Sequence, residues 1–329
     1  MHNASWHRLV VATLFLAGLV QPLFAAPSCS TRPPAAPALK QLQSVMASGR
    51  WIAYQPTSLQ VFDGQLTQAD AASIKQDLQT LRPRFDGVIT YRSNHGADQV
   101  ADIAAQLGYR ALILGIWDIG STQEIAAAVA AVKRHPKLVV GISLGNERLF
   151  AKKASAAQLA AAIQQLRQQA PQLALTTTEP FHIFLQPGSA DIMQASDFML
   201  VNVHPVFEPW FRTAPDANAA EFMTNVVEKL RAVACGPILV KETGVPTAPE
   251  SMGYTPARQA SFYTALQQRF KPGRHAAFAY FSAFDAPWRV NDESPVPGVH
   301  PEEAHWGLFD ERRAPKLVVQ KIPPLNTAH

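Results

Sequence analysis

The sequence predicts an α/β fold made of one domain, a single (β/α)8 TIM barrel. From Arg50 onward, short apolar runs of strand length alternate with amphipathic helical stretches, which is the pattern of repeated βα units around a parallel sheet. Eight such runs are present, and eight βα units close into a barrel. The first run ends Tyr54-Gln-Pro-Thr57, without the glycine-rich loop that an open doubly wound sheet places there. The barrel is therefore the fold that the sequence favours.

Each expected strand is a continuous apolar run, typical of a strand that is buried on both faces. In chain order the strands are Trp51–Pro56, Gly87–Arg92, Ala111–Trp117, Val139–Glu147, Ala174–Glu179, Phe198–His204, Ile238–Glu242 and Ala277–Phe284. The helices expected between them cover Thr67–Leu81, Ala97–Leu107, Thr122–His135, Ser155–Gln169, Asn218–Ala234 and Pro256–Phe270.

The N-terminus has the pattern of a cleaved export signal, which we assign to residues 1–26. His7 and Arg8 precede an apolar run that ends at Val20, and this run is too short to anchor the chain in a bilayer. The following Pro- and Ala-rich segment predicts a tether over residues 27–49, ahead of a barrel domain at 50–329. We therefore expect a periplasmic or extracellular protein without a stable membrane anchor. Export permits a disulfide between Cys29 and Cys235, although sequence alone leaves the pairing open.

Composition excludes some partners. The net charge of +4 is spread along the 329 residues, and no Lys- and Arg-rich block interleaves with aromatic residues. The chain therefore lacks the signature of a nucleic-acid-binding groove. We expect a monomer.

Two of the expected strands end at a glutamate. The run Leu138-Val-Val-Gly-Ile-Ser-Leu-Gly-Asn-Glu147 stops at Glu147, and the run Pro237-Ile-Leu-Val-Lys-Glu-Thr-Gly244 carries Glu242. The C-terminal strand ends of a barrel meet at one face, where such enzymes keep their chemistry. Two carboxylates facing each other there are the apparatus of a glycosidase, in which one protonates the leaving oxygen and the other attacks the anomeric carbon. Their surroundings must then split their pKa values.

Asn146 and the long loops fit the same chemistry. Asn146 is placed to hydrogen-bond the sugar 2-hydroxyl, a contact that tightens in the transition state. The longest connections, Pro205–Ala217 and Ala286–His305, follow the sixth and eighth strands. Their aromatic residues suit the apolar faces of sugars, and they are Trp210, Phe211, Trp288 and, just beyond, Trp306.

Four segments of the chain resemble the family 17 glycoside hydrolases. They are Gly145-Asn146-Glu147, Lys241-Glu-Thr-Gly-Val-Pro246, Tyr280-Phe-Ser-Ala-Phe-Asp-Ala-Pro-Trp288 and His305-Trp-Gly-Leu-Phe309 with Pro315-Lys316. The resemblance extends from about Arg50 to Lys316. It implies that Glu147 is the general acid/base and Glu242 the nucleophile of a retaining enzyme that hydrolyses β-1,3-glucan or transfers it to new acceptors. It also implies that no metal or organic cofactor is needed.

The chain departs from that family at the eighth strand. Bacterial relatives often carry acidic residues where Ser282 and Ala286 stand here. The departure leaves the preferred linkage, the choice between hydrolysis and transfer, and endo or exo action open.

Further polar and aromatic residues at the strand ends are candidates for substrate contacts. His204 is expected to donate a hydrogen bond to Glu242, with Asn202 sharing that role. Tyr54 is a candidate for the −1 subsite, and Arg92 for the acid/base, a sugar hydroxyl or a structural ion pair. Glu179 is expected to be a subsite residue or an ion-pair partner. Phe284, Asp285 and Trp288 follow the eighth strand, and Trp288 is the favoured sugar-stacking ring.

Three other functions compete with this one. A metal-dependent barrel hydrolase is disfavoured, because the first strand lacks the His-x-His that such enzymes place there. A barrel that has lost catalysis and only binds carbohydrate stays open because of the altered eighth strand. A glycosidase of the same clan that acts on another β-glucan linkage also stays open.

Overall fold

A computed structural model describes residues 35–291 and 298–325 of the chain. Eight parallel strands close into a barrel, because the last strand pairs with the first. Around the barrel the order is β1-β10-β9-β8-β7-β6-β5-β4. Their bounds are β1 Trp51–Ala53, β4 Gly87–Ile89, β5 Ala111–Ile116, β6 Val139–Asn146, β7 Ala174–Pro180, β8 Met199–Asn202, β9 Ile238–Glu242 and β10 Ala276–Tyr280. The predicted TIM barrel is confirmed.

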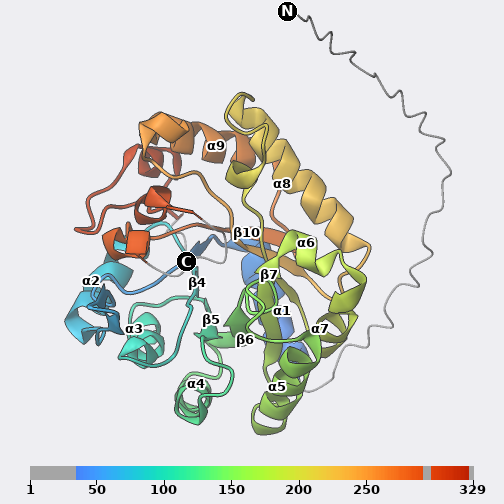
Figure 1. Ribbon diagram of the computed structural model, residues 1–329. Coiled ribbons are helices and arrows are strands. Elements are labelled where there is room, and N and C mark those ends of the chain that lie inside the picture. Colours follow the sequence, from blue (N-terminus) through green and yellow to red (C-terminus); the bar gives the residue numbers. More distant parts are fainter. Residues whose placement is uncertain (1–34, 292–297, 326–329) are drawn as a thin grey trace, which may run out of the picture.

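The helices form a ring outside the strands (Figure 1). Their bounds are α2 Ala71–Leu81, α3 Val100–Gln106, α4 Thr122–Arg134, α5 Ala156–Gln169, α6 Phe181–Phe184, α7 Ala190–Ala195, α8 Asp216–Arg231 and α9 Pro256–Arg269. Several begin at a side-chain cap; for example, Ser155 accepts a hydrogen bond from the backbone N–H of Gln158 at the start of α5, which satisfies a donor that has no partner within the helix. No helix in the described part of the chain is long and apolar enough to cross a membrane.

The first helix, α1 (Ala36–Ser48), corrects the predicted tether. We expected residues 27–49 to be an extended linker, but Leu42, Val45 and Met46 of α1 are fully buried. They join Trp51 and the inward-facing strand residues in one cluster that closes the N-terminal end of the barrel. The Pro and Ala content of this segment is typical of a linker, although its apolar residues recur at helical spacing. The rest of the predicted tether, the export signal and Cys29 lie outside the described residues.

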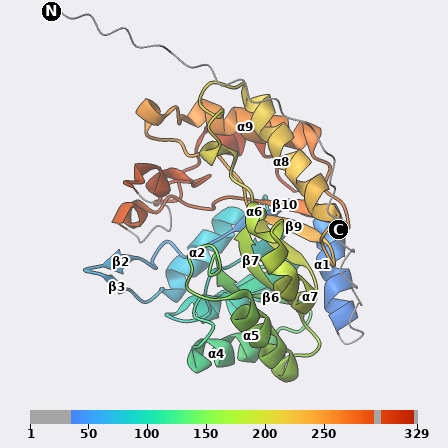
Figure 2. The same cartoon turned by 45° about the vertical axis from the view of Figure 1, so that its right-hand side comes forward.

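A short hairpin stands at the other end of the barrel. Strands β2 (Val61–Phe62) and β3 (Gln65–Leu66) pair antiparallel in the loop between β1 and α2. Figure 2 shows this hairpin and α1 at opposite ends of the molecule. The hairpin therefore lies on the face where the strands end, and α1 covers the face where they begin.

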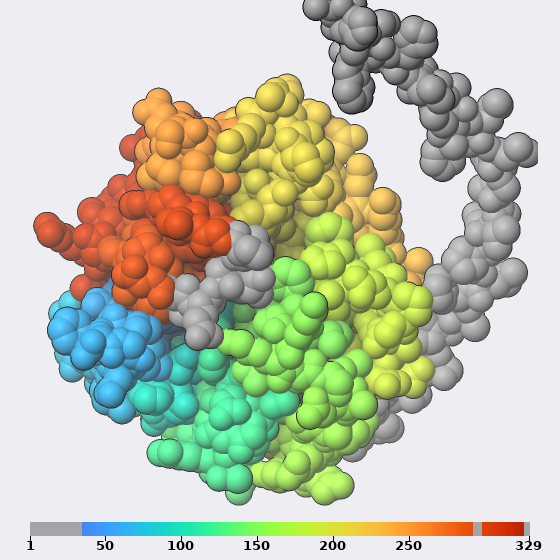
Figure 3. Space-filling view, viewed as in Figure 1, coloured from blue at the N-terminus to red at the C-terminus, as the bar shows by residue number. Residues whose placement is uncertain are grey.

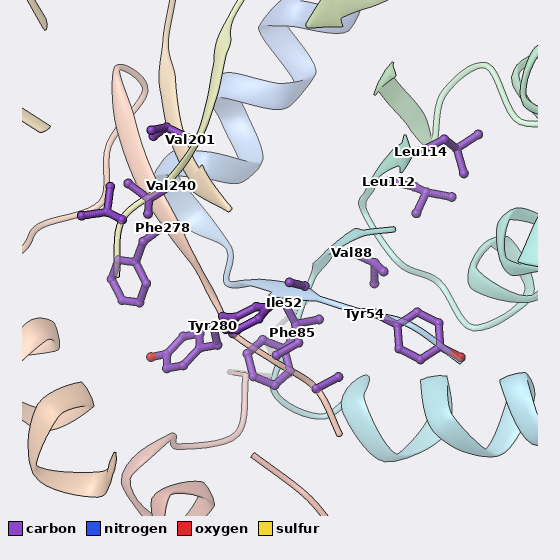
Figure 4. Close-up of a cluster of buried hydrophobic side chains, with 14 of the residues drawn as sticks. Ile52, Tyr54, Phe85, Val88, Leu112, Leu114, Val201, Val240, Phe278 and Tyr280 are labelled. Carbon is purple, nitrogen blue, oxygen red and sulfur yellow. The ribbon is translucent and has the colours of Figure 1, made fainter. Parts of the chain in front are cut away.

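The barrel wall separates two apolar layers. Side chains that point inward, among them Ile113, Phe198 and Leu239, fill the barrel interior. Side chains that point outward, among them Ile52 and Val240, pack under the helices (Figure 4). This alternation follows from the two-residue period of a strand, and it fixes which strand-end side chains reach the barrel mouth. Figure 3 shows how the loops and helices pack around that mouth.

We predict that α1 stabilises the barrel. Leu42 is fully buried, so Leu42→Ala should lower the free energy of unfolding by about 2–5 kcal/mol. The exposed Lys40 on the same helix provides the control, since Lys40→Ala should change it by no more than about 0.5 kcal/mol. Chemical denaturation of the two variants measures the difference. Equal losses would contradict a packing role for α1.

Candidate active site

Register shifts in the barrel bring both glutamates to its mouth. On β9, Val240 pairs with Val201 and Glu242 pairs with Asn202, so Lys241 is an extra residue in the ladder. On β6, Ser143 and Asn146 pair with Thr176 and Thr178 of β7, which again leaves one extra residue in β6. An extra residue bends a strand and re-aims the side chains that follow it. Asn146, Glu147, Lys241 and Glu242 consequently all take part in one cluster.

Glu147 sits in a strained backbone conformation just after β6. Its φ angle is 54°, a left-handed value that costs free energy for any residue other than glycine. Two backbone hydrogen bonds hold Glu147 there. The Glu147 N–H donates to the Thr178 carbonyl at 2.8 Å, and the Ala151 N–H donates to the Glu147 carbonyl at 2.8 Å. Its carboxylate accepts a hydrogen bond from Asn202 Nδ2 at 2.8 Å. We expected Asn202 to act on Glu242 instead; the structure places it on the other glutamate.

Glu242 is more deeply buried and receives more donors. Tyr91 donates its hydroxyl to Oε1 at 2.9 Å, and His204 Nε2 lies 3.3 Å from Oε2. The ammonium of Lys241 lies 3.7 Å from Oε1. The residue is 6% exposed, whereas Glu147 is partly open to the cleft. His204 occupies the place that the sequence predicted for it.

The two carboxyl groups are driven toward opposite protonation states. Burial, followed by the negative charge of Glu242, raises the pKa of Glu147. Burial alone would also raise the pKa of Glu242, but the hydrogen bond from His204 and the charge of Lys241 lower it to about 2. The surroundings thus favour a proton on Glu147 and an ionised Glu242, a division of roles that proton transfer and nucleophilic attack require.

A cavity of about 490 Å³, counted with its opening to solvent, is lined by Tyr91, the residue that donates its hydroxyl to Glu242. It extends from Tyr91 past Ser282, Phe284 and Asp285 to Trp288, and it includes Gln55, Gln60, Arg289 and Glu311. These residues follow β1, β4 and β10. Strand β6, which carries Glu147, lies on the far side of the barrel from β10. The cavity therefore opens on the side of the mouth opposite Glu147.

Two of the predicted contact residues face away from the mouth. The Tyr54 side chain is fully buried and donates its hydroxyl to Asp77 of α2 at 2.9 Å, because strand alternation turns it outward, beside Ile52 (Figure 4). Glu179 is also fully buried. Within the described part of the chain it has no ion-pair partner, and its burial closes it to a subsite. It accepts hydrogen bonds from the backbone N–H groups of Leu149 at 2.7 Å and Phe150 at 3.0 Å.

Other predicted residues line the mouth but are engaged by the protein. Asp285 lies in the cavity, yet its Oδ1 accepts from Lys316 Nζ at 2.6 Å and from Gly307 N–H at 2.8 Å, which fastens the C-terminal tail to the loop after β10. Arg92 stacks over the Trp117 ring at 5.2 Å, and its Nη1 lies 3.5 Å from Asn94 Oδ1.

The expected aromatic residues separate into two groups. Trp306 is 1% exposed and packs against His204 and Phe281 at ring distances of 5.1 and 5.0 Å, so it supports the site from behind. Trp210 packs against Phe222 of α8. Trp288 and Phe284 line the cavity. The sugar-stacking role expected of Trp288 stays a prediction.

Sequence reasoning missed two residues of the cluster. Tyr91 is the immediate neighbour of Arg92. Because successive side chains of a strand point to opposite faces, an error of one residue in the expected direction replaces Tyr91 with Arg92. Lys241 lies within the quoted motif, but strict alternation would have placed it and Glu242 on opposite faces. Only the register shift in β9 brings both to the mouth.

The described residues contain no group of three or more His, Cys, Asp or Glu side chains that is arranged to hold a metal ion. Cys235 is disulfide-bonded. Its predicted partner, Cys29, lies outside the described residues.

Comparison with known proteins identifies the family. A family model described as the BtgE/BtgC glycoside hydrolase domain matches residues 52–307. The chain belongs to this family. The result agrees with the resemblance to family 17 glycoside hydrolases that the strand-end motifs carry.

Relatives and solved structures of this glycoside hydrolase family are similar along most of the barrel. A protein of Arthroderma benhamiae named glucan 1,3-beta-glucosidase is 27% identical over 78% of this chain and 86% of its own length. The probable beta-glucosidase btgE of Emericella nidulans is 30% identical over 53% of this chain, but only 31% of that longer protein is covered. The crystal structure of a family 17 beta-1,3-glucanosyltransferase from Rhizomucor miehei superposes with a TM-score of 0.61 at 22% identity, over 82% of this chain and 95% of that one.

We predict that Glu179 makes stability depend on pH. Burial raises the pKa of Glu179 to about 7. Between its ordinary pKa and pH 7, Glu179 therefore keeps its proton in the folded state and loses it in the unfolded chain. Stability should therefore fall as the pH rises from about 4.5 to 7 and change no further above that range, with an effect on the order of 3 kcal/mol. Denaturant unfolding of wild type and Glu179→Gln across this range measures it. A pH dependence that is identical in both proteins would contradict the prediction.

Proposed function

We propose that this protein is a retaining β-glucan hydrolase or glucanosyltransferase that acts on β-1,3-linked glucan. The observation that carries the proposal is the pair of strand-end glutamates whose surroundings favour opposite protonation states. Glu242 is the nucleophile, because a deeply buried carboxylate that stays ionised is suited to attack the anomeric carbon. Glu147 is the acid/base, because it keeps its proton and is open to the cleft.

The reaction proceeds in two steps through a covalent glycosyl-enzyme. In the first, Glu242 attacks the anomeric carbon while Glu147 gives its proton to the departing oxygen. In the second, Glu147 takes a proton from water or from a sugar hydroxyl, which then attacks the anomeric carbon and releases Glu242. The identity of that second acceptor decides between hydrolysis and transfer.

The position of Glu147 also assigns the two halves of the cleft. The acid must lie beside the leaving group, so the leaving sugars bind on the β6 side of the mouth. The sugars that remain on the enzyme bind on the opposite side, in the cavity with Trp288 and Phe284. Asn146 is adjacent to the acid and contacts the 2-hydroxyl of the sugar under attack.

The substrate and the location follow from the relatives. Two of them are named as glucan 1,3-beta-glucosidases, from Arthroderma benhamiae and Saccharomyces cerevisiae, and another is named a cell surface mannoprotein, from Candida albicans. These names support a β-1,3-glucan substrate and an exported enzyme. The N-terminal signal predicted over residues 1–26 fits the same location.

Product analysis tests the reaction. The mature protein, incubated with linear β-1,3-gluco-oligosaccharides of one length, should give shorter products by mass spectrometry if water is the acceptor, and longer ones as well if a sugar is. Glu242→Gln removes the nucleophile while keeping its shape, so it should give neither. Wild-type rates in that variant would refute the assignment of Glu242, and an unchanged substrate with the wild-type enzyme would count against β-1,3-glucan.

The pH dependence tests Glu147. Its raised pKa means that it keeps its proton to higher pH than an exposed glutamate, whereas Glu242 loses its proton near pH 2. kcat/KM should therefore decline toward high pH as Glu147 ionises. With an activated aryl glycoside, whose leaving group needs little protonation, Glu147→Gln should remain active and lose that decline. A decline with the same midpoint in the variant would contradict the acid/base role.

A further inference from the structure

Lys241 is a buried cation at the centre of the cluster. It is 1% exposed. It belongs to β9, next to Glu242, and its ammonium reaches Asn146 at the end of β6. A buried ammonium is costly unless its hydrogens are satisfied and its charge is compensated. Burial has the largest effect on the pKa of Lys241 and lowers it. The charges of Glu242 and Glu147 raise this pKa and the charge of Arg289 lowers it, and the result is a pKa of about 8. Lys241 thus carries its charge at neutral pH.

The ammonium makes three contacts, each of a different kind. It donates a hydrogen bond to Asn146 Oδ1 at 2.7 Å. It lies 3.9 Å from the centre of the Tyr91 ring, where the negative face of the ring attracts a cation. It lies 3.7 Å from Glu242 Oε1, which is beyond an ordinary hydrogen bond. Asn146 is therefore its one short polar contact among the described residues.

This contact fixes which end of the Asn146 amide faces the lysine. An ammonium has three donors and no acceptor, so only the carbonyl oxygen Oδ1 can face it. The amide nitrogen Nδ2 must then point the other way. No described residue accepts a hydrogen bond from Nδ2, which leaves both of its hydrogens for a ligand in the mouth.

We propose that Lys241 is a positioning residue that locks the Asn146 amide with its NH₂ group toward the substrate, so that it donates to the 2-hydroxyl of the sugar under attack. Without Lys241 the amide is free to turn over and present its carbonyl. Because Lys241 touches Asn146 and approaches Glu242, it also couples the 2-hydroxyl contact to the nucleophile. The inference rests on the proposed function, since it assigns a part of that reaction to a further residue.

The test compares a pair of aryl β-glycosides that differ only in the 2-hydroxyl of the sugar under attack. The ratio of kcat/KM for the 2-hydroxy and 2-deoxy substrates measures what that hydroxyl contributes. In Lys241→Met, which has no donor, this ratio should fall by roughly ten-fold or more, because the contact acts mainly in the transition state. Lys241→Gln has the same length as Met but carries a neutral donor, so its ratio should lie between those of Lys241→Met and wild type.

Each outcome decides between this role and a simpler one. If kcat/KM falls equally for both substrates, so that the ratio stays at the wild-type value, Lys241 acts only on the Glu242 charge or on the fold, and the proposal is overturned. Thermal unfolding shows which variants fold, and the ratio in either folded variant is sufficient to decide. Wild-type turnover of the 2-hydroxy glycoside is measured first, because its absence would refute the proposed function rather than the role of Lys241.

Discussion

The site depends on keeping one buried carboxylate charged next to another that is neutral. Removing a charge from water is costly, and the charge kept on Glu242 in turn raises the pKa of Glu147. The protein offsets this cost with Tyr91, His204 and Lys241, which approach Glu242 from three different strand ends. Among the described residues, the side-chain donor to the Glu147 carboxyl group is the neutral amide of Asn202. The difference in donors, rather than any difference in the two carboxyl groups themselves, separates their pKa values and hence their roles.

The barrel supplies these donors because its strands do not run in strict register. Regular alternation would send every second strand-end side chain out under the helices, as it does with Tyr54. The extra residue in β9 breaks the alternation that would otherwise separate Lys241 from Glu242, and the extra residue in β6 lies just before Asn146. The left-handed backbone at Glu147 is part of the same local bend, and Glu179 holds the chain that follows it by accepting from Leu149 and Phe150. The strain is thus supported by a carboxylate that lies outside the cleft.

The same physics explains how far the sequence could be interpreted. Continuous apolar runs follow directly from burial on both faces, so the eight strands and the glutamates at the ends of β6 and β9 could be predicted. Side-chain direction at a strand end depends on a single residue of register, which no apolar pattern records. For this reason the sequence points to Arg92 where Tyr91 makes the contact, and it predicts Tyr54 and Glu179 in the mouth although both are buried behind it. Helix α1 was missed for another reason: its buried stripe of Leu42, Val45 and Met46 is embedded in a composition typical of linkers.

The unequal burial of the two glutamates fits the two steps of the proposed reaction. A nucleophile that forms and then breaks a covalent bond benefits from fixed partners and little water, and Glu242 has both. An acid that must later accept a proton from an incoming hydroxyl has to stay open to the side from which that hydroxyl comes, and Glu147 is partly exposed there. Since the cavity with Trp288 lies on the opposite side, a sugar bound in it can remain in place while the leaving group is exchanged for water or for another sugar. In the proposed reaction the acceptor is therefore selected on the β6 side of the mouth, and the loops on that side control the balance of hydrolysis and transfer more than the residues around the cavity do.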